Sequence, residues 1–169
     1  MGITRCVVSS HYVPTFTHAF KIDLRRLLHK RVPHEQCTIP HTRETCDRVA
    51  HFLQEYADFF DEADHVLIER QPPVGLKDIE GLIMQAHRAK TTLISPNKMH
   101  KFFGISRFSY EERKVRTEHI ASPHLEGIST YENNTRRHDM ADSACICLFF
   151  VDTQRRRNPV RLPFDEYRL

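Results

Sequence analysis

Two helical patterns alternate with two short apolar runs in the middle of the chain, and this alternation limits the fold more than any other feature. Apolar residues recur at spacings of three and four over residues 42–60 and 76–89, as on the buried face of a helix. The runs that follow each helix, at 65–69 and 91–95, have the length and composition of buried strands, and proline comes soon after both. Helices alternating with strands predict an α/β protein.

The flanking regions add strands on one side and helices on the other. Residues 3–24 are rich in β-branched and aromatic side chains, which favours two or three short antiparallel strands. Thr42, with Glu44 and Asp47 close behind it, is a start signal for the first helix. We therefore expect a mixed sheet, with the antiparallel strands first and parallel strands after them, flanked by helices. Further helices are predicted over 109–121 and 137–151. Residues 122–136 are predicted as a loop, 25–41 as a loop with at most a helical turn near 25–30, and 96–108 as a loop or a short helix.

The bulk properties favour an intracellular protein with no membrane partner. The length of 169 residues suits one domain. No apolar run reaches the ~18 residues that a membrane-spanning helix needs, and the first residues show no secretion signal. Five cysteines, an odd number, favour reduced thiols over a disulfide framework. We expect the domain to cover residues 1–151 and residues 152–169 to form an irregular basic tail.

Charge is distributed unevenly, although the net charge is only +3. Residues 41–64 hold seven acids and two bases, whereas residues 90–120 hold seven bases and three acids. A basic segment separated from an acidic one suggests a surface for phosphate groups. Ordinary solvated surface charge is the alternative for any single lysine or arginine.

Three carboxylates are placed where packing does not require them. Glu69 ends the predicted strand 65–69, and sites form at the C-terminal ends of strands in α/β sheets. Asp139 and Asp142 are three apart, so on a helix they share one face. The alternatives are an ion pair of Glu69 with a base such as Arg70, and simple capping of the helix by the two aspartates. A strand-end glutamate with such a pair could supply most of a two-metal phosphodiesterase site.

Four short motifs make this carboxylate set more specific. Residues 66–71 (VLIERQ) form an apolar strand followed by Glu-x-Gln, and residues 138–144 (HDMADSA) form Asp-x-x-Asp before an apolar helix. Residues 95–98 (SPNK) and 110–114 (YEERK) lie between them. In order and spacing, the four resemble the RuvC-like Holliday junction resolvases, closest to the poxvirus and iridovirus enzymes and to those of fungal mitochondria.

The resemblance implies an RNase H-like fold and a homodimer that cuts four-way or otherwise branched DNA junctions. It implies Mg²⁺ as the cofactor, with Mn²⁺ able to substitute, held by Glu69, Asp139 and Asp142. A viral protein of this kind would act in the host cytoplasm or nucleus, where viral DNA is replicated. The resemblance also implies a set of DNA-contacting bases: Lys98, Lys101, Arg113, Lys114, Arg136 and Arg137.

One family residue has no counterpart in this chain. The family carries an Asp in its first strand, and residues 1–4 (MGIT) resemble the positions just after it, so the matching position falls immediately before Met1. Three explanations are open. The start is assigned too far downstream; or another group, such as His11, His138 or Asp23, supplies the ligand; or the protein binds junctions without cutting them. We favour the first, and we expect the chain as given to be impaired in cutting.

Histidine and cysteine suggest two other chemistries. His34, Cys37, His41 and Cys46 lie close together in the sequence and are ligands that zinc accepts. Cys46, however, falls on the apolar face of the first predicted helix, where we expect it to be buried, and the spacing of the four matches no zinc finger. A cysteine hydrolase built on Cys145 or Cys147 is the remaining alternative, but no base is near either cysteine in the sequence.

Overall fold

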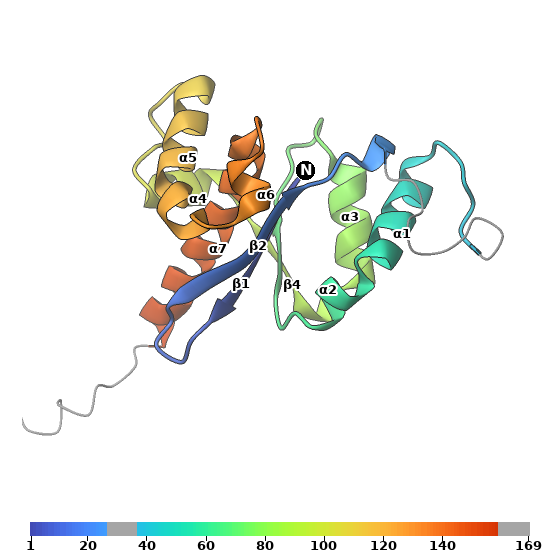
Figure 1. Ribbon diagram of the computed structural model, residues 1–169, viewed down its shortest axis with the longest axis horizontal. Helices are drawn as coiled ribbons and strands as arrows, with labels where there is room; N and C mark the ends of the chain where they lie inside the picture. The colour runs from blue at the N-terminus through green and yellow to red at the C-terminus, as the bar shows by residue number, and fades with distance from the viewer. Residues whose placement is uncertain (27–36, 159–169) are drawn as a thin grey trace, which may run out of the picture. The chain divides into compact units, whose positions relative to one another are not determined.

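The computed structural model describes residues 1–26 and 37–158, which fall into two units (Figure 1). The first comprises Met1 and the described part of Lys21–Ser106. The second comprises Gly2–Phe20 and the described residues from Arg107 onward. Each unit is described below by itself.

A parallel strand pair is the centre of the first unit. β3 (Val66–Glu69) and β4 (Thr91–Ile94) run side by side in a register that sets Val66 against Thr91 and Glu69 against Ile94. The backbone N–H of Arg70 donates to the Ile94 carbonyl at 2.8 Å and continues the ladder past the strand end. Both strands were predicted within one residue of their observed bounds.

Helices precede, connect and follow this pair in the chain. α1 (Thr45–Glu55), α2 (Ala57–Asp61) and α3 (Lys77–Ala86) precede or connect the strands, and α1 packs against α3. The short elements are η1 (Leu24–Arg26), η3 (Arg88–Lys90) and α4 (Pro96–Phe102). The core of the unit is made of apolar side chains from helices and strands together, namely Val49, Phe52, Val66, Ile83, Ile94 and Met99.

The first helix departs from its prediction at both ends. It begins at Thr45 rather than at 42, because the Thr42 hydroxyl accepts from the Glu44 N–H and donates to the Asp47 carboxylate in a turn ahead of the helix. It breaks at Tyr56, whose φ of −112° and ψ of 24° are not helical, so that α2 is a separate helix. The predicted span to residue 60 is therefore two helices.

The second unit pairs a hairpin with a helical layer. β1 (Gly2–Val8) and β2 (Pro14–Lys21) form an antiparallel two-stranded sheet, joined by a turn in which Tyr12 adopts a left-handed conformation with φ of 57°. The helices are α5 (Tyr110–Leu125), α6 (Ser129–Glu132) and α7 (Arg137–Arg157). α7 packs against both α5 and β1, as Figure 1 shows for the hairpin.

Two helices of this unit run further than predicted. α5 starts at a capping box, in which Ser109 and Glu112 satisfy each other's backbone N–H groups, and it continues through Pro123 to Leu125. A proline near the helix end removes one backbone hydrogen bond, which the burial of Ala121 and Leu125 offsets. The predicted loop at 122–136 therefore begins later and contains α6.

α7 likewise continues beyond the predicted end at Val151. Asp152 pairs with Arg155 at 3.1 Å and with Arg156 at 2.5 Å, one turn further along the helix. Basic side chains in the last turn also suit the helix dipole. The first residues of the predicted irregular tail are thus helical up to Arg157, and residues 159–169 lie outside the described part of the chain.

The mixed α/β class is confirmed. The strands nevertheless form two two-stranded sheets, one antiparallel and one parallel, instead of the single mixed sheet that we expected. Among the described residues no helix is long and apolar enough to cross a membrane.

Replacing Leu125 with Ala is expected to lower the free energy of unfolding by about 2–5 kcal/mol, because a large buried side chain would leave a cavity. Leu125 is 0% exposed on α5, whereas Val115 on the same helix is 70% exposed. V115A is the matched control, with a change within about 0.5 kcal/mol. Urea denaturation followed by circular dichroism measures both, and equal losses in the two variants would contradict the buried face of α5.

Candidate functional site

Glu69 is the last residue of β3, where the sequence predicted it. Its side chain is exposed to solvent and accepts a hydrogen bond from the Gln71 side-chain amide at 3.3 Å. The surrounding protein makes the charged form costly and raises the pKa of Glu69, an effect that the amide of Gln71 partly offsets. A strand end that carries a carboxylate with a raised pKa is a candidate functional position.

A buried acid that sequence reasoning missed holds the turn after β3. Glu80 on α3 is 6% exposed; it accepts from the Gln71 backbone N–H at 2.5 Å and from Lys77 Nζ at 2.6 Å. Burial alone would raise the pKa of Glu80, but the hydrogen bonds from Lys77 and Gln71, with the nearby charge of Arg70, lower it overall. The spacing of Lys77 and Glu80, one helical turn apart, was the available sequence signal.

Asp139 and Asp142 lie in the first turns of α7, on the shared face that their spacing predicted. Arg136 lies 3.6 Å from one Asp139 oxygen, and His138 Nε2 lies 3.3 Å from the other. Asp142 is half-buried, and its negative charge contributes to the raised pKa of Cys145. Both aspartates are therefore partly shielded from solvent, and Asp139 lies beside two bases.

The start of β1 lies directly against the Asp139 backbone. A Cβ built on Gly2 would come within 1.8 Å of the Asp139 carbonyl oxygen, so this contact needs glycine. Two residues further along, the hydroxyls of Thr4 and Ser143 are hydrogen-bonded at 3.0 Å. The first residues of β1 and the first turns of α7 are thus held together.

The three predicted metal ligands are divided between the units. Glu69 belongs to the first unit, and Asp139 and Asp142 belong to the second. The spacing of the aspartates on one helix face is observed, whereas the convergence of all three carboxylates stays a prediction.

The predicted DNA-contacting bases fall into two groups. Lys98 and Lys101 on α4 and Arg136 ahead of α7 are exposed, as residues that contact phosphates need to be. Two others hold their own unit together: Arg113 donates to the Phe108 carbonyl at 2.6 Å, and Arg137 donates to the Glu132 carbonyl at 2.6 Å.

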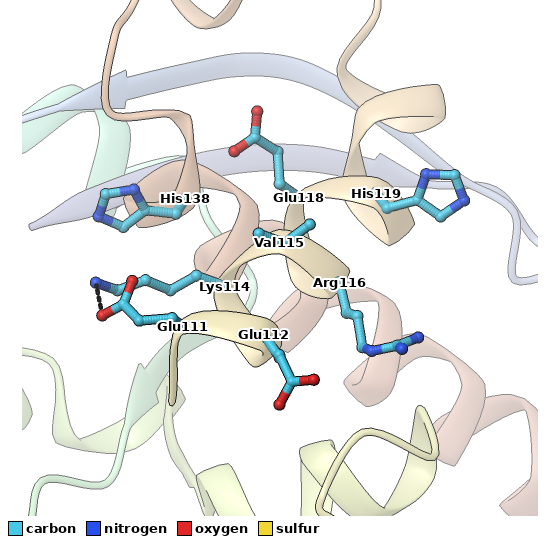
Figure 2. Close-up of a pocket in the computed structure, with 8 residues that line it drawn as sticks. All are labelled: Glu111, Glu112, Lys114, Val115, Arg116, Glu118, His119 and His138. Carbon is cyan, nitrogen blue, oxygen red and sulfur yellow. Dashed lines mark hydrogen bonds and ion pairs between the residues drawn. The ribbon is translucent and has the colours of Figure 1, made fainter. Parts of the chain in front are cut away.

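Lys114 lines a shallow surface hollow beside α5. Figure 2 shows its ammonium group paired with Glu111, with the His138 ring on the same side of the helix. Lys114 Nζ also lies 4.1 Å from the centre of the Tyr110 ring. Every lining side chain except Val115 carries a charged group or an imidazole. Its lining residues are Glu111, Glu112, Lys114, Val115, Arg116, Glu118, His119 and His138.

The cysteines of α7 do not suit a nucleophile. Cys145 is 0% exposed, and burial together with the charge of Asp142 raises its pKa to about 12. The pKa of Cys147 is also raised, through its contact with Cys6 and through burial. A catalytic cysteine needs an accessible thiolate at neutral pH, which neither residue provides.

The predicted cysteine and histidine group is rearranged. His34 lies outside the described residues, and Cys46, which we expected to be buried, is exposed in the first turn of α1. Cys37 and His41 instead lie close to His51, a residue that the sequence did not single out.

Comparisons with protein-family models, with curated proteins and with solved structures gave no match to this chain. The RNase H-like fold and the resolvase family therefore remain predictions that rest on the four motifs.

At neutral pH and without divalent metal, E69Q is expected to be more resistant to unfolding than the wild type. The pKa of Glu69 is raised above its ordinary value of 4.5 in the folded state. Glu69 therefore binds its proton more tightly in the folded protein than in the unfolded chain. The contribution of Glu69 to stability is therefore greatest below pH 4.5 and is lost as the pH rises through the raised pKa.

Urea midpoints measured across pH test this, and the advantage of E69Q should shrink toward pH 4.5. Exposed Glu62 at the end of α2 provides the control E62Q. An advantage of the same size in E62Q would show that removing any negative charge has this effect.

Proposed function

We propose that the protein is a Mg²⁺-dependent, structure-specific DNA endonuclease that resolves four-way or otherwise branched junctions. The observation that carries the proposal is the position of Glu69, an acid at the C-terminal end of a parallel strand, in a turn braced by buried Glu80. A bound cation would favour the charged form of Glu69 and so act against its raised pKa. The order of the four motifs supports the same conclusion.

The donor set fits the proposed metal. Glu69, Asp139 and Asp142 offer only carboxylate oxygens, which Mg²⁺ prefers and which Mn²⁺ also accepts. An ion held by these carboxylates would supply an activated water and charge stabilisation for the leaving oxygen of the phosphodiester. In this scheme the three carboxylates hold the cation, and His138 and Arg136 orient Asp139 from either side.

The remainder of the scheme concerns DNA. Exposed Lys98, Lys101 and Arg136 would contact backbone phosphates, which gives affinity that depends on salt and little on sequence. The other three bases would contribute positive charge from fixed positions, because hydrogen bonds hold Arg113 and Arg137 and a ring contact holds Lys114. An RNase H-like arrangement of the two units and a homodimer that cuts two strands belong to the same proposal.

A second candidate is a junction-binding protein of the same fold with impaired cutting. The pairing of Asp139 with Arg136 and His138 favours it, because these bases compete with a metal ion for the carboxylate. The two candidates share DNA binding and differ in hydrolysis.

E69Q, D139N and D142N are each expected to reduce Mg²⁺-dependent cutting of a labelled four-way junction by more than about 100-fold, because each removes a metal ligand. Binding, measured by gel shift with Ca²⁺ in place of Mg²⁺, should be kept. D152N is the matched control, since Asp152 lies on the same helix but pairs with Arg155 and Arg156.

The outcomes separate the candidates. Cutting that is lost in the three variants and kept in D152N supports the nuclease. Junction binding by the wild type without any cutting overturns the nuclease and supports the binder. No preference for junctions over linear duplex overturns both.

K98A and K101A are each expected to weaken junction binding and to reduce the slope of log affinity against log salt by about one. Both lysines are exposed on α4. R88A, which removes an exposed base of the same unit outside the predicted set, should leave the slope unchanged. Fluorescence anisotropy over a salt series provides the measurement. An equal change of slope in R88A would show that the effect comes from the net charge of the protein and not from contacts of Lys98 and Lys101 with DNA.

A further inference from the structure

Three zinc-type ligands converge in the first unit. The Sγ of Cys37 and one ring nitrogen each of His41 and His51 all lie within 4.8 Å of one another. Zinc bonds of ~2.0–2.3 Å imply separations of roughly 3.3–3.8 Å between ligand atoms in a tetrahedral site. Side-chain movements of about 1 Å would therefore bring the three ligand atoms to the separations of a zinc site.

The local fold explains why these residues meet. His51 is on the buried side of α1, where it is only 7% exposed. Cys37 and His41 belong to the segment that leads into α1, and Pro40 in that segment accepts a hydrogen bond from His51 Nε2 at 3.1 Å. The turn made by Thr42 and Asp47 then directs the chain into the helix. A segment without regular structure is thus held over one histidine of a helix.

The hydrogen bond to Pro40 also prepares His51 chemically. A carbonyl oxygen can only accept, so Nε2 carries the proton of the neutral ring and Nδ1 carries the lone pair. Histidines that bind metals usually show this arrangement, in which the second nitrogen donates to a carbonyl or carboxylate. The His41 and His51 rings are 4.9 Å apart between centroids and tilted by 49°, so the two rings are close neighbours but are not stacked.

We propose that Cys37, His41 and His51 bind one Zn²⁺ ion, with water or a further donor as the fourth ligand. One thiolate and two imidazoles form a soft donor set, which favours zinc over Mg²⁺ or Ca²⁺. His41 is exposed, so the ion has a route of entry from solvent. The role is structural: the ion fastens the segment at 37–41 to α1. The site is independent of the proposed nuclease.

Cys46 provides a matched control for the role of Cys37 in zinc binding. It lies nine residues after Cys37 and close to the three ligands in sequence, but it is exposed and its Sγ donates to Asp47 at 3.7 Å. A ligand set chosen by sequence proximity includes Cys46, whereas the set chosen by geometry includes His51 instead. Loss of zinc in C46S and loss of zinc in C37S therefore test different sites.

The experiment measures metal content of the purified full chain and its titration with Zn²⁺ and Co²⁺, in buffer containing excess Mg²⁺ and no DNA. Wild type and C46S should retain about one zinc per chain and give a thiolate-to-cobalt charge-transfer band. C37S should lose that band. C37S and H41N should both bind zinc more weakly by more than about tenfold, with circular dichroism showing that both are folded.

Because His51 is buried, H51N tests the site only if it folds, and the exposed His41 carries the test in its place. Zinc content well below one per chain in the wild type, with no cobalt band, overturns the proposal. So does equal zinc affinity in wild type, C37S and H41N. Loss of zinc in C46S together with retention in H41N would overturn this ligand set. Since no DNA is present, failure here leaves the nuclease proposal unaffected.

Discussion

Close packing of α7 is the interaction on which the second unit depends. The helix buries Ala141 and Ala144 completely, and small side chains allow neighbouring backbones to approach. The approach of β1 is so close that Gly2 has no room for a Cβ beside Asp139. The contact that builds the core therefore also determines where Asp139 lies. A larger side chain at Gly2 would move an acid of the candidate site as well as weaken the packing.

In the first unit an ion pair between the buried acid Glu80 and the exposed base Lys77 has the corresponding role. Glu80 pairs with Lys77 and receives the Gln71 N–H, so the chain leaving β3 has little freedom to turn otherwise. Removing Lys77 would leave the buried Glu80 carboxylate with one hydrogen-bond donor fewer, which destabilises the folded state. Glu80 thus positions Glu69 without contacting it, and loss of Glu80 would disturb the strand end together with the stability of the unit.

Much of the fold could be predicted from hydrophobic periodicity, because the positions of the main helices and strands depend on which residues are buried. The strands ending at Glu69 and Ile94 were predicted for this reason. Periodicity does not register a local change of backbone angles, so the break at Tyr56 was missed. It also overstates burial at a helix start, where Cys46 follows the apolar spacing but precedes the packed turns. His51 was missed because periodicity predicts apolar residues on a buried face. The burial of a polar residue there is explained only by its hydrogen bond to Pro40, which the sequence does not show.

The two metal proposals make different demands on one chain. Zinc generally binds nitrogen and sulfur donors more tightly than Mg²⁺ does, so a protein keeps Mg²⁺ at a site by offering oxygen donors only. Glu69, Asp139 and Asp142 meet that condition, whereas Cys37 and His51 belong to the softer set.

Histidine and cysteine bind metals in their deprotonated forms, so the softer set gains affinity as the pH rises. The burial of His51 lowers its pKa, with the hydrogen bond to Pro40 and the charge of Asp47 acting against this, and so favours the neutral ring that a metal requires. The donor chemistry of each group is therefore sufficient to direct the two ions to different parts of the molecule.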